Sequence, residues 1–217
     1  MKPIRAVIFD LDGVIVSTDE SHYLGWQRVA DEEGIYFDRH INERLRGVSR
    51  MQSLDILLER AGRPYSTQER VAMAERKNNY YKQLINKITA ADILPGALDV
   101  INNLKARGVK VAIASSSKNA PALLKLIGLD RAFDAVVSGN DIERTKPDPQ
   151  VFLLAAERVA IPPAECLVVE DAGAGVEGAL NGGMRVLAVG AAAGDPRASA
   201  RAVDLTAISI GQILAIG

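Results

Sequence analysis

The sequence predicts an α/β fold, in which a Rossmann-like, doubly wound parallel-sheet core carries an inserted α-helical cap domain. Three observations lead to this prediction. Short, continuous apolar runs recur along the chain, and such runs are typical of strands that are buried on both faces of a parallel sheet. Amphipathic helical patterns separate most of these runs. One interval of about a hundred residues interrupts the alternation, although a parallel crossover needs only a dozen or so.

The apolar runs are predicted to form strands that cover residues 6–9, 109–114, 134–138, 167–170 and 185–189. Helical patterns alternate with the later runs, over residues 98–107, 120–127, 150–160 and 173–181. Because strand and helix alternate, right-handed crossovers between parallel strands are expected.

The long interval after the first strand contains three helical patterns, over residues 21–33, 50–61 and 67–87, and no evident strand pattern. We interpret residues 18–91 as a helical cap domain, and residues 1–17 with 92–217 as the catalytic core. Pro95 and Gly96 mark the second linker. A small domain inserted beside a strand end would act as a lid over that end.

Composition and net charge argue against several classes of protein. The 217 residues carry a formal net charge of −1, so no basic excess indicates nucleic acid or a membrane surface as a partner. No apolar stretch reaches the ~20 residues of a membrane span. Cys166 is the only cysteine, which excludes an intramolecular disulfide and favours a cytoplasmic location. Its apolar neighbours predict a buried structural thiol.

Polar side chains follow the predicted strands at the points where they end. Asp10 and Asp12 follow the first strand, residues 115–119 (SSSKN) follow the second, Lys146 comes after the third, and Glu170-Asp171 ends the fourth. In an open α/β sheet, binding sites form at this edge. Each group alone has a simpler interpretation, as a turn, a helix-entry loop, a solvated charge or an acidic helix start. Their joint occurrence at successive strand ends predicts one site.

The chemistry of this cluster indicates phosphoryl transfer. Converging carboxylates would repel one another unless a cation lay among them, and oxygen ligands favour Mg²⁺ over zinc. Ser115 and Lys146 supply a hydroxyl and an ammonium group, which suit a phosphoryl group. An aspartate can then act as the nucleophile and pass through an aspartyl-phosphate.

Three motifs carry a family resemblance. FDLDG (residues 9–13), the pair Ser115 and Lys146, and EDAGAG (residues 170–175) resemble the four motifs of the haloacid-dehalogenase-like phosphotransferases. The resemblance covers essentially the whole chain, including the insertion, which is similar to the helical cap of that group.

Further motifs resemble the β-phosphoglucomutase family within that group. They are TDESH (residues 18–22) with Trp26, GVSR (47–50), RKN (76–78) and SSSKN (115–119). Enzymes of that family interconvert β-D-glucose 1-phosphate and glucose 6-phosphate through an aspartyl-phosphate and β-glucose 1,6-bisphosphate. Related sugar phosphatases share parts of these motifs.

The resemblance implies a role for each residue of the cluster. Asp10 would be the nucleophile and a Mg²⁺ ligand. Asp12 would be the general acid and base, with its backbone carbonyl on the metal. Glu170 and Asp171 would complete the protein ligands, while Ser115 and Lys146 would hold the transferring phosphoryl group.

The resemblance also implies a set of substrate-binding residues. Arg50 would anchor the second phosphate, His22 would lie near Asp12, and Thr18 would be a hinge residue. Without the resemblance, Arg50 and Lys77 would be interpreted as solvated helix charges, and Trp26 as ordinary cap packing. The full set is Thr18, His22, Trp26, Gly47, Val48, Ser49, Arg50, Lys77, Ser116, Ser117, Lys118 and Asn119. His40 has no matching position and is expected to lie in a loop.

Three functions remain open at this point. The leading one is a Mg²⁺-dependent β-phosphoglucomutase that is primed by β-glucose 1,6-bisphosphate and works as a monomer on a small phosphorylated sugar. A sugar-phosphate phosphatase, in which water replaces the second hydroxyl, is the main alternative. A non-catalytic sugar-phosphate binding protein is the third, but it would have no need for both Asp10 and Asp12.

Overall fold

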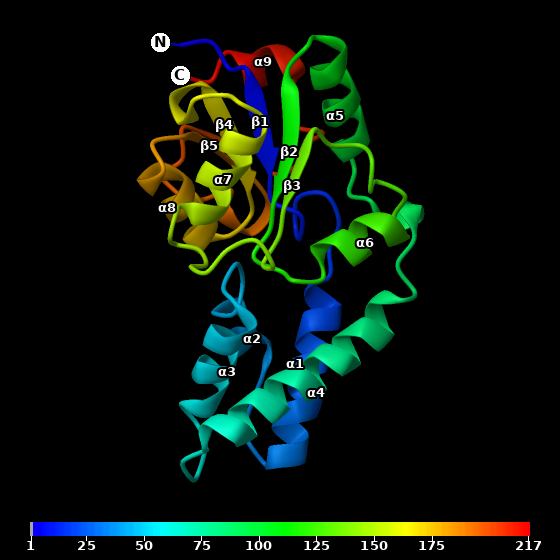
Figure 1. Cartoon of the computed structure of the whole chain (residues 1–217), viewed down its shortest axis with the longest axis vertical. Helices are drawn as coiled ribbons and strands as arrows, with labels where there is room; N and C mark the ends of the chain where they lie inside the picture. The colour runs from blue at the N-terminus through cyan, green and yellow to red at the C-terminus, as the bar shows by residue number, and fades with distance from the viewer. Residues whose placement is uncertain (1) are drawn as a thin grey trace.

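The structure is a computed structural model that describes residues 2–217, so that Met1 lies outside the described residues. Two lobes are stacked along its longest axis (Figure 1). One is built around the β-sheet and holds both chain ends, and the other consists of the helices that lie between the first and second strands. We call them the core lobe and the helical lobe.

The core lobe contains a sheet in which the described strands all pair in parallel, in the order β3-β2-β1-β4-β5-β6. The strands are β1 (Ala6–Phe9), β2 (Lys110–Ala114), β3 (Ala135–Val137), β4 (Cys166–Glu170), β5 (Arg185–Ala188) and β6 (Ala200–Arg201). The chain winds outward from β1 in one direction and then from β4 in the other. Ligand sites in such sheets form at this switch point, beyond the carboxyl ends of β1 and β4.

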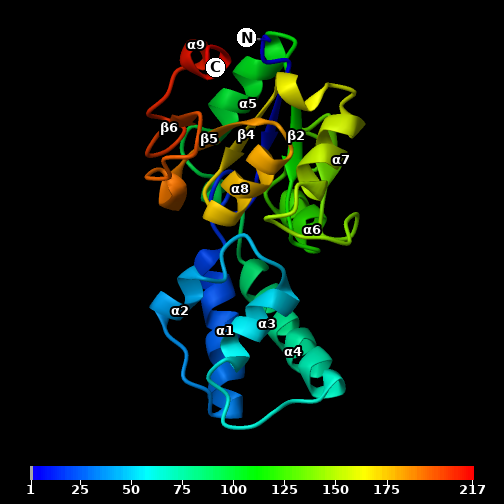
Figure 2. The ribbon, with the colours of Figure 1, turned by 90° about the vertical axis from the view of Figure 1, so that its left-hand side faces the viewer.

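Helices cover both faces of the sheet (Figure 2). They are α5 (Ala97–Ala106), α6 (Ala120–Leu126), α7 (Gln150–Arg158), α8 (Gly173–Asn181) and α9 (Ile210–Leu214), with short 3₁₀ turns at Pro163–Glu165 and Gly190–Ala192. Val7 and Phe9 of β1 belong to the core on one face, and Ala6 and Ile8 belong to the core on the other. This alternation explains why β1 is apolar at every position.

The helical lobe has an apolar core of its own. Its elements are α1 (Asp19–Glu33), α2 (Arg39–Glu43), α3 (Arg50–Leu58) and α4 (Thr67–Ile85), followed by a 3₁₀ turn at Ala90–Asp92. Trp26 and Val29 of α1 pack there with Leu54 and Leu57 of α3 and with Met73 of α4. The boundaries of a separate cap domain at residues 18–91 stay a prediction.

The α/β fold class with a Rossmann-like parallel core is confirmed, and the five expected strands are observed to within one residue at each end. Helices α3, α4 and α7 end two or three residues earlier than expected, because the chain turns at their ends. Three further helices and strands, α2, β6 and α9, were not expected. Each is too short to produce a periodic pattern.

The expectation that His40 lies in a loop is wrong. His40 belongs to α2, a helix of five residues. The carboxylate of Asp38 starts this helix by accepting the backbone N–H of Ile41 at 2.8 Å. An N-cap aspartate stabilises a helix start, but one turn of helix has almost no apolar periodicity to reveal it.

Among the described residues, no helix combines the length and the apolar character that crossing a membrane requires. Cys166 is a free, fully buried thiol in β4, as expected. Its sulfur lies 3.5 Å from the carbonyl oxygen of Pro162. Burial raises the pKa of the Cys166 thiol to about 11, and Arg185 opposes that shift only partly.

We expect Cys166 to be nearly inert toward iodoacetamide in the native protein at pH 8. Its raised pKa keeps the thiolate population about a hundredfold below that of an ordinary cysteine, and burial blocks access as well. Mass spectrometry of alkylated protein, with and without guanidinium chloride, measures the two rates. Similar rates in the two conditions would contradict the buried position of Cys166.

Candidate active site

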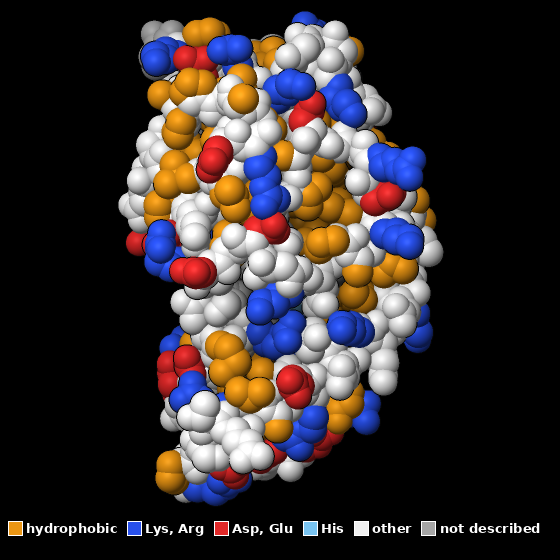
Figure 3. Space-filling model, in the orientation of Figure 1, with side chains coloured by type: hydrophobic (Ala, Val, Ile, Leu, Met, Phe, Trp, Pro, Cys, Tyr) orange, Lys and Arg blue, Asp and Glu red, His pale blue; other side chains and the backbone are white. Residues whose placement is uncertain are grey.

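A cavity of about 900 Å³ lies between the two lobes, at the carboxyl ends of β1 and β4. The core lobe contributes the loops that follow β1, β2, β3 and β4, and the helical lobe contributes α1, α3, α4 and the loop before α3. On the face shown in Figure 3, Lys and Arg side chains gather at the waist between the lobes. Such a cavity suits an anionic ligand of sugar size.

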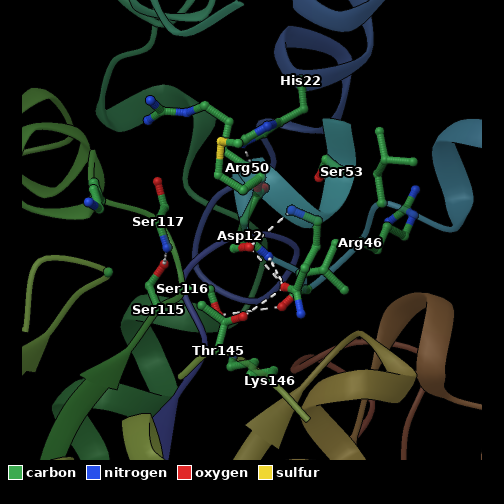
Figure 4. A pocket seen from close by; sticks show the side chains of 18 of the residues that line it. Asp12, His22, Arg46, Arg50, Ser53, Ser115, Ser116, Ser117, Thr145 and Lys146 are labelled. Atoms are coloured by element: carbon green, nitrogen blue, oxygen red, sulfur yellow. Dashed lines mark hydrogen bonds and ion pairs between the residues drawn. The ribbon is translucent and has the colours of Figure 1, made fainter. Parts of the chain in front are cut away.

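The floor of the cavity is a buried cluster of charges around Lys146 (Figure 4). The Lys146 ammonium group donates to Asp10 Oδ1 at 2.5 Å and also to Glu170 Oε1. Burial alone would lower the pKa of Lys146, but the charges of Asp10 and Glu170 raise it above its ordinary value. Lys146 therefore stays protonated and compensates both carboxylates.

Register brings these carboxylates together. Phe9 of β1 is paired with Val169 of β4, so that the next residues along the two strands, Asp10 and Glu170, leave the sheet at the same level. The backbone N–H of Asp10 continues the ladder to the carbonyl oxygen of Val169 at 2.9 Å. Asp10 Oδ2 has no hydrogen-bond partner within residues 2–217, which leaves this oxygen available to a ligand.

Asp12 has a different environment. Its carboxylate accepts the backbone N–H of Thr18 at 2.6 Å and the Thr18 hydroxyl, and His22 Nε2 lies 3.5 Å from Oδ2. Burial and the nearby charge of Asp19 raise the pKa of Asp12 to about 7. A carboxyl group with this pKa can both donate and accept a proton near neutral pH, which is what a general acid and base requires.

Lys77, which is buried, and His22, which is partly exposed, form a pair at the helical-lobe side of the cavity. Lys77 is only 2% exposed, and its nitrogen lies 2.7 Å from His22 Nδ1. Burial and the charge of Arg50 lower the pKa of Lys77 to about 7. Burial, with the charges of Lys77 and Arg50, lowers the pKa of His22 well below its ordinary value, so that His22 is neutral near pH 7. Lys77 is therefore not a solvated charge on a helix surface, which is how it would be interpreted without the family resemblance.

Asp171 lies against the turn that follows β1. A Cβ atom added to Gly13 would come within 2.1 Å of Asp171 Oδ2, and the Gly13 backbone has φ +83°. Only glycine therefore fits this turn. Burial and the charges of Glu170, Asp10 and Asp12 raise the pKa of Asp171 to about 9.

This crowding of carboxylates fits a hard divalent cation. Asp171 and Asp10 offer the carboxylate oxygens that Mg²⁺ prefers, and a cation would relieve the repulsion that Asp171 experiences. Over residues 2–217, no three His, Cys, Asp or Glu side chains form a complete metal-binding cluster by themselves. A cation here would therefore also need oxygens from the backbone, water or substrate. Glu170 Oε1 binds Lys146 and Oε2 accepts the N–H of Ala172, so that its role as a ligand stays a prediction.

The segment after β2 turns sharply at the edge of the cavity. Ser115 Oγ accepts the N–H of Ser117 at 3.1 Å, and Ser117 Oγ accepts the N–H of Asn119 at 3.2 Å. The Asn119 side chain reaches the helical lobe, where its Nδ2 donates to Asn78 Oδ1 at 2.8 Å. These bonds hold the three polar side chains in place beside the cavity.

Arg50 is the first residue of α3, whose start is fixed by a capping box between Ser49 and Gln52. Its side chain lines the cavity. Within the described chain, no carboxylate lies within 4 Å of its guanidinium group and no side-chain hydrogen bond to it is formed. Burial lowers the pKa of Arg50, but its ordinary value is so high that the group stays charged.

All but one of the site residues predicted from the sequence line this one cavity. The exception is Thr18, which is 1% exposed and lies behind Asp12. Its assignment to substrate binding is not supported by this position, because it contacts the carboxylate instead of the cavity. Trp26 lines the cavity and also packs in the core of the helical lobe.

Several cavity residues were missed by the sequence analysis, among them Asp19, Arg46, Gln52, Asn78, Arg144 and Thr145. Asp19 and Asn78 lie within the motifs TDESH and RKN, but the resemblance gave neither of them a role. Arg46 and Thr145 are adjacent to the predicted residues Gly47 and Lys146, and this adjacency was the available signal.

A family model for haloacid dehalogenase-like hydrolases matches residues 4–183. The chain belongs to this family. Members of the haloacid dehalogenase-like family generally use Mg²⁺, in agreement with the donor set around Asp10 and Asp171.

Relatives within the family include more than one activity. The chain is 42% identical over 195 residues to β-phosphoglucomutase of Bacillus subtilis, covering 89% of this chain and 85% of that protein. The crystal structure of a β-phosphoglucomutase from Clostridium difficile is similar, with a TM-score of 0.92, 37% identity and coverage of 97% and 95%. A phosphorylated carbohydrates phosphatase of Thermotoga maritima is 30% identical over 184 residues, covering 83% of this chain and 82% of that protein.

A substitution at Gly175 tests how closely helix α8 packs against Glu170 of the charge cluster. A Cβ atom at this position in α8 would lie 1.9 Å from Glu170 Oε1. In an open helix interior, replacing Gly by Ala would stabilise the protein by about 1 kcal/mol. We expect Gly175→Ala to destabilise it by about 1–3 kcal/mol instead, because the carboxylate must shift.

Chemical denaturation of Gly175→Ala measures this change. Gly211→Ala is the matched control, because Gly211 lies in a helix, α9, and only Ser209 Oγ lies near a Cβ atom there, at 4.0 Å. A stabilised Gly175→Ala variant would contradict the contact between α8 and Glu170.

Proposed function

We propose that the protein is a Mg²⁺-dependent β-phosphoglucomutase, which interconverts β-D-glucose 1-phosphate and glucose 6-phosphate. In this proposal the phosphoryl group passes through Asp10, and β-glucose 1,6-bisphosphate is the intermediate that also primes the enzyme. The similarity to β-phosphoglucomutases over most of the chain supports the activity.

The single observation that carries the proposal is the position of Arg50. A mutase must bind a sugar that carries a phosphate at the end remote from the reaction. Arg50 and the charge cluster of Asp10 and Lys146 line the same cavity, and the Arg50 guanidinium group is not neutralised by a carboxylate of the described chain within 4 Å. A free guanidinium group binds phosphate bidentately, so that one cavity offers two places for phosphate.

The first half of the reaction starts from phosphorylated Asp10. The 6-hydroxyl oxygen of β-glucose 1-phosphate attacks the phosphorus while Asp12 accepts the hydroxyl proton, and the bond between phosphorus and the Asp10 oxygen breaks. Asp10 returns as a carboxylate, held by Lys146. Mg²⁺, when bound, neutralises charge on the transferring phosphoryl group.

The second half reverses these roles after the bisphosphate has turned round. Asp10 Oδ2 attacks the phosphorus at position 1, and protonated Asp12 gives its proton to the departing anomeric oxygen. Glucose 6-phosphate and phosphorylated Asp10 result. Because the pKa of Asp12 lies near 7, both proton transfers are accessible at neutral pH. Thr18 and neutral His22 position this carboxyl group.

A sugar-phosphate phosphatase is the second candidate, because a carbohydrate phosphatase is among the relatives at 30% identity. The same Asp12 could take a proton from water instead of a sugar hydroxyl. The two reactions differ in the need for the remote phosphate site, so that Arg50 distinguishes them.

The proposed location is the cytoplasm, and the proposed oligomeric state is a monomer. The single free cysteine is compatible with a reducing compartment. Sedimentation equilibrium measures the oligomeric state independently of activity.

We expect Arg50→Ala to reduce mutase turnover about a hundredfold, because a charge-assisted contact to the remote phosphate is lost. Hydrolysis of acetyl phosphate, which has no second phosphate, should change by less than about threefold on the same argument. Arg60→Ala, an exposed arginine of the same lobe that pairs with Glu59, is the control. Equal losses in the two reactions would remove the second-site argument.

We expect Asp10→Asn to reduce turnover by about 10³-fold or more, because an amide cannot form the phosphoryl ester. Intact-protein mass spectrometry after brief exposure to acetyl phosphate should show one added phosphoryl group on the parent and none on the variant. Asp31→Asn, in the exposed part of α1, is the control and should still be phosphorylated. Phosphorylation of Asp10→Asn would rule out Asp10 as the nucleophile.

A further inference from the structure

Arg46 connects the two lobes at the side of the cavity opposite Ser117 (Figure 4). It lies in the loop between α2 and α3, and its Nη1 atom is 2.5 Å from Asp19 Oδ2 and 3.6 Å from Asp171 Oδ2. Asp19 is the first residue of α1 in the helical lobe, whereas Asp171 follows β4 in the core lobe. One guanidinium group therefore bridges a carboxylate from each lobe.

This contact differs in kind from the other polar contacts between the lobes. Thr145 donates its hydroxyl to Gln52 at 2.7 Å, Asn119 donates to Asn78, and Ser116 donates to the carbonyl oxygen of Gly47 at 3.4 Å. These pairs are neutral, and His22 beside Asp12 is neutral as well. Within residues 2–217, Arg46 and Asp171 are the one pair of an arginine or lysine with a carboxyl group that joins the lobes.

Arg46 is the cationic side chain that approaches Asp171. Lys146 binds Asp10 and Glu170 instead, and in the described chain no other cationic side chain lies within 4 Å of Asp171. Asp171 is 7% exposed and lies near four further carboxylates. A buried carboxylate in this position attracts whichever cation can reach it.

The Arg46 guanidinium group is held on one side only. Its Nε atom is buried without a partner among the described residues, which is unfavourable for the closed arrangement. The attraction to the two carboxylates offsets this cost while they remain uncompensated. A second cation near Asp171 would weaken that attraction and would also repel the guanidinium group.

We propose that Arg46 is an electrostatic latch, which is held by Asp19, closes the helical lobe onto Asp171 and competes with a divalent cation for that carboxylate. The closed state is then favoured when Asp171 has no metal, and cation binding loosens it. The proposal rests on the proposed function only in taking Mg²⁺ as the cation at Asp171. By thermodynamic linkage the latch and the cation weaken each other by the same factor, so that removing the latch tightens cation binding by up to that factor.

The test compares metal-free protein with Arg46→Gln, Arg46→Lys and Arg44→Gln. Arg46→Gln removes the charge, and Arg46→Lys keeps it. Arg44→Gln is the matched control, because Arg44 lies two residues earlier and pairs with Glu59 inside the helical lobe at 2.6 and 2.7 Å. Titration calorimetry with MgCl₂ at constant ionic strength gives the Kd for Mg²⁺, and small-angle X-ray scattering without metal reports how open the lobes are.

We expect Arg46→Gln to bind Mg²⁺ about three- to tenfold more tightly than the parent, a modest factor because the Arg46 side chain is partly exposed. Its radius of gyration without metal should exceed that of the parent. Arg46→Lys and Arg44→Gln should resemble the parent in both measurements. A Kd for Arg46→Gln within the error of the parent, or an unchanged scattering profile, would overturn the latch.

Both measurements are made without substrate and without turnover. A shifted Kd in a protein that proves to lack mutase activity would therefore leave the latch standing and reject the proposed function. An active mutase with an unshifted Kd would reject the latch and leave the proposed function standing.

Discussion

The structure depends on the compensation of buried carboxylates by Lys146. Asp10 and Glu170 follow adjacent parallel strands, and the pairing of Phe9 with Val169 places them side by side. Two unpaired carboxylates could not remain ionised there, and removing one partner from a buried ion pair destabilises a protein by about 3–5 kcal/mol. Lys146, which is itself fully buried, binds both. The same contact that allows the sheet to end in acidic residues also leaves one Asp10 oxygen free to react.

The helical lobe contributes residues that act on Asp12 at the carboxyl-end edge of the sheet. Thr18 precedes α1, and Asp19 and His22 belong to it, yet all three act on Asp12 of the core. Lys77, from α4, is buried beside His22, and its ammonium group lies 5.2 Å from the ring centroid of Trp26 and 4.8 Å from that of Tyr81. The proposed acid and base site therefore depends on contacts from both lobes.

Much of this could be predicted from the sequence, because the relevant signals are local. Continuous apolar runs identified the strands, and polar groups at strand ends identified Asp10, Ser115, Lys146 and Glu170. The remainder depends on tertiary contacts. Lys77 lies in a segment that is polar in sequence, and only packing against α1 buries it. The contact between Arg46 and Asp171 joins residues that are far apart in the chain and follows from how the lobes meet.

The most direct test of the account is phosphorus NMR of the purified protein with Mg²⁺, β-glucose 1-phosphate and a trace of β-glucose 1,6-bisphosphate, with the α-anomer in a parallel sample. A β-phosphoglucomutase will form glucose 6-phosphate from the β-anomer alone, without release of inorganic phosphate. Growth of inorganic phosphate in place of glucose 6-phosphate would contradict the proposed function and would make the protein a phosphatase.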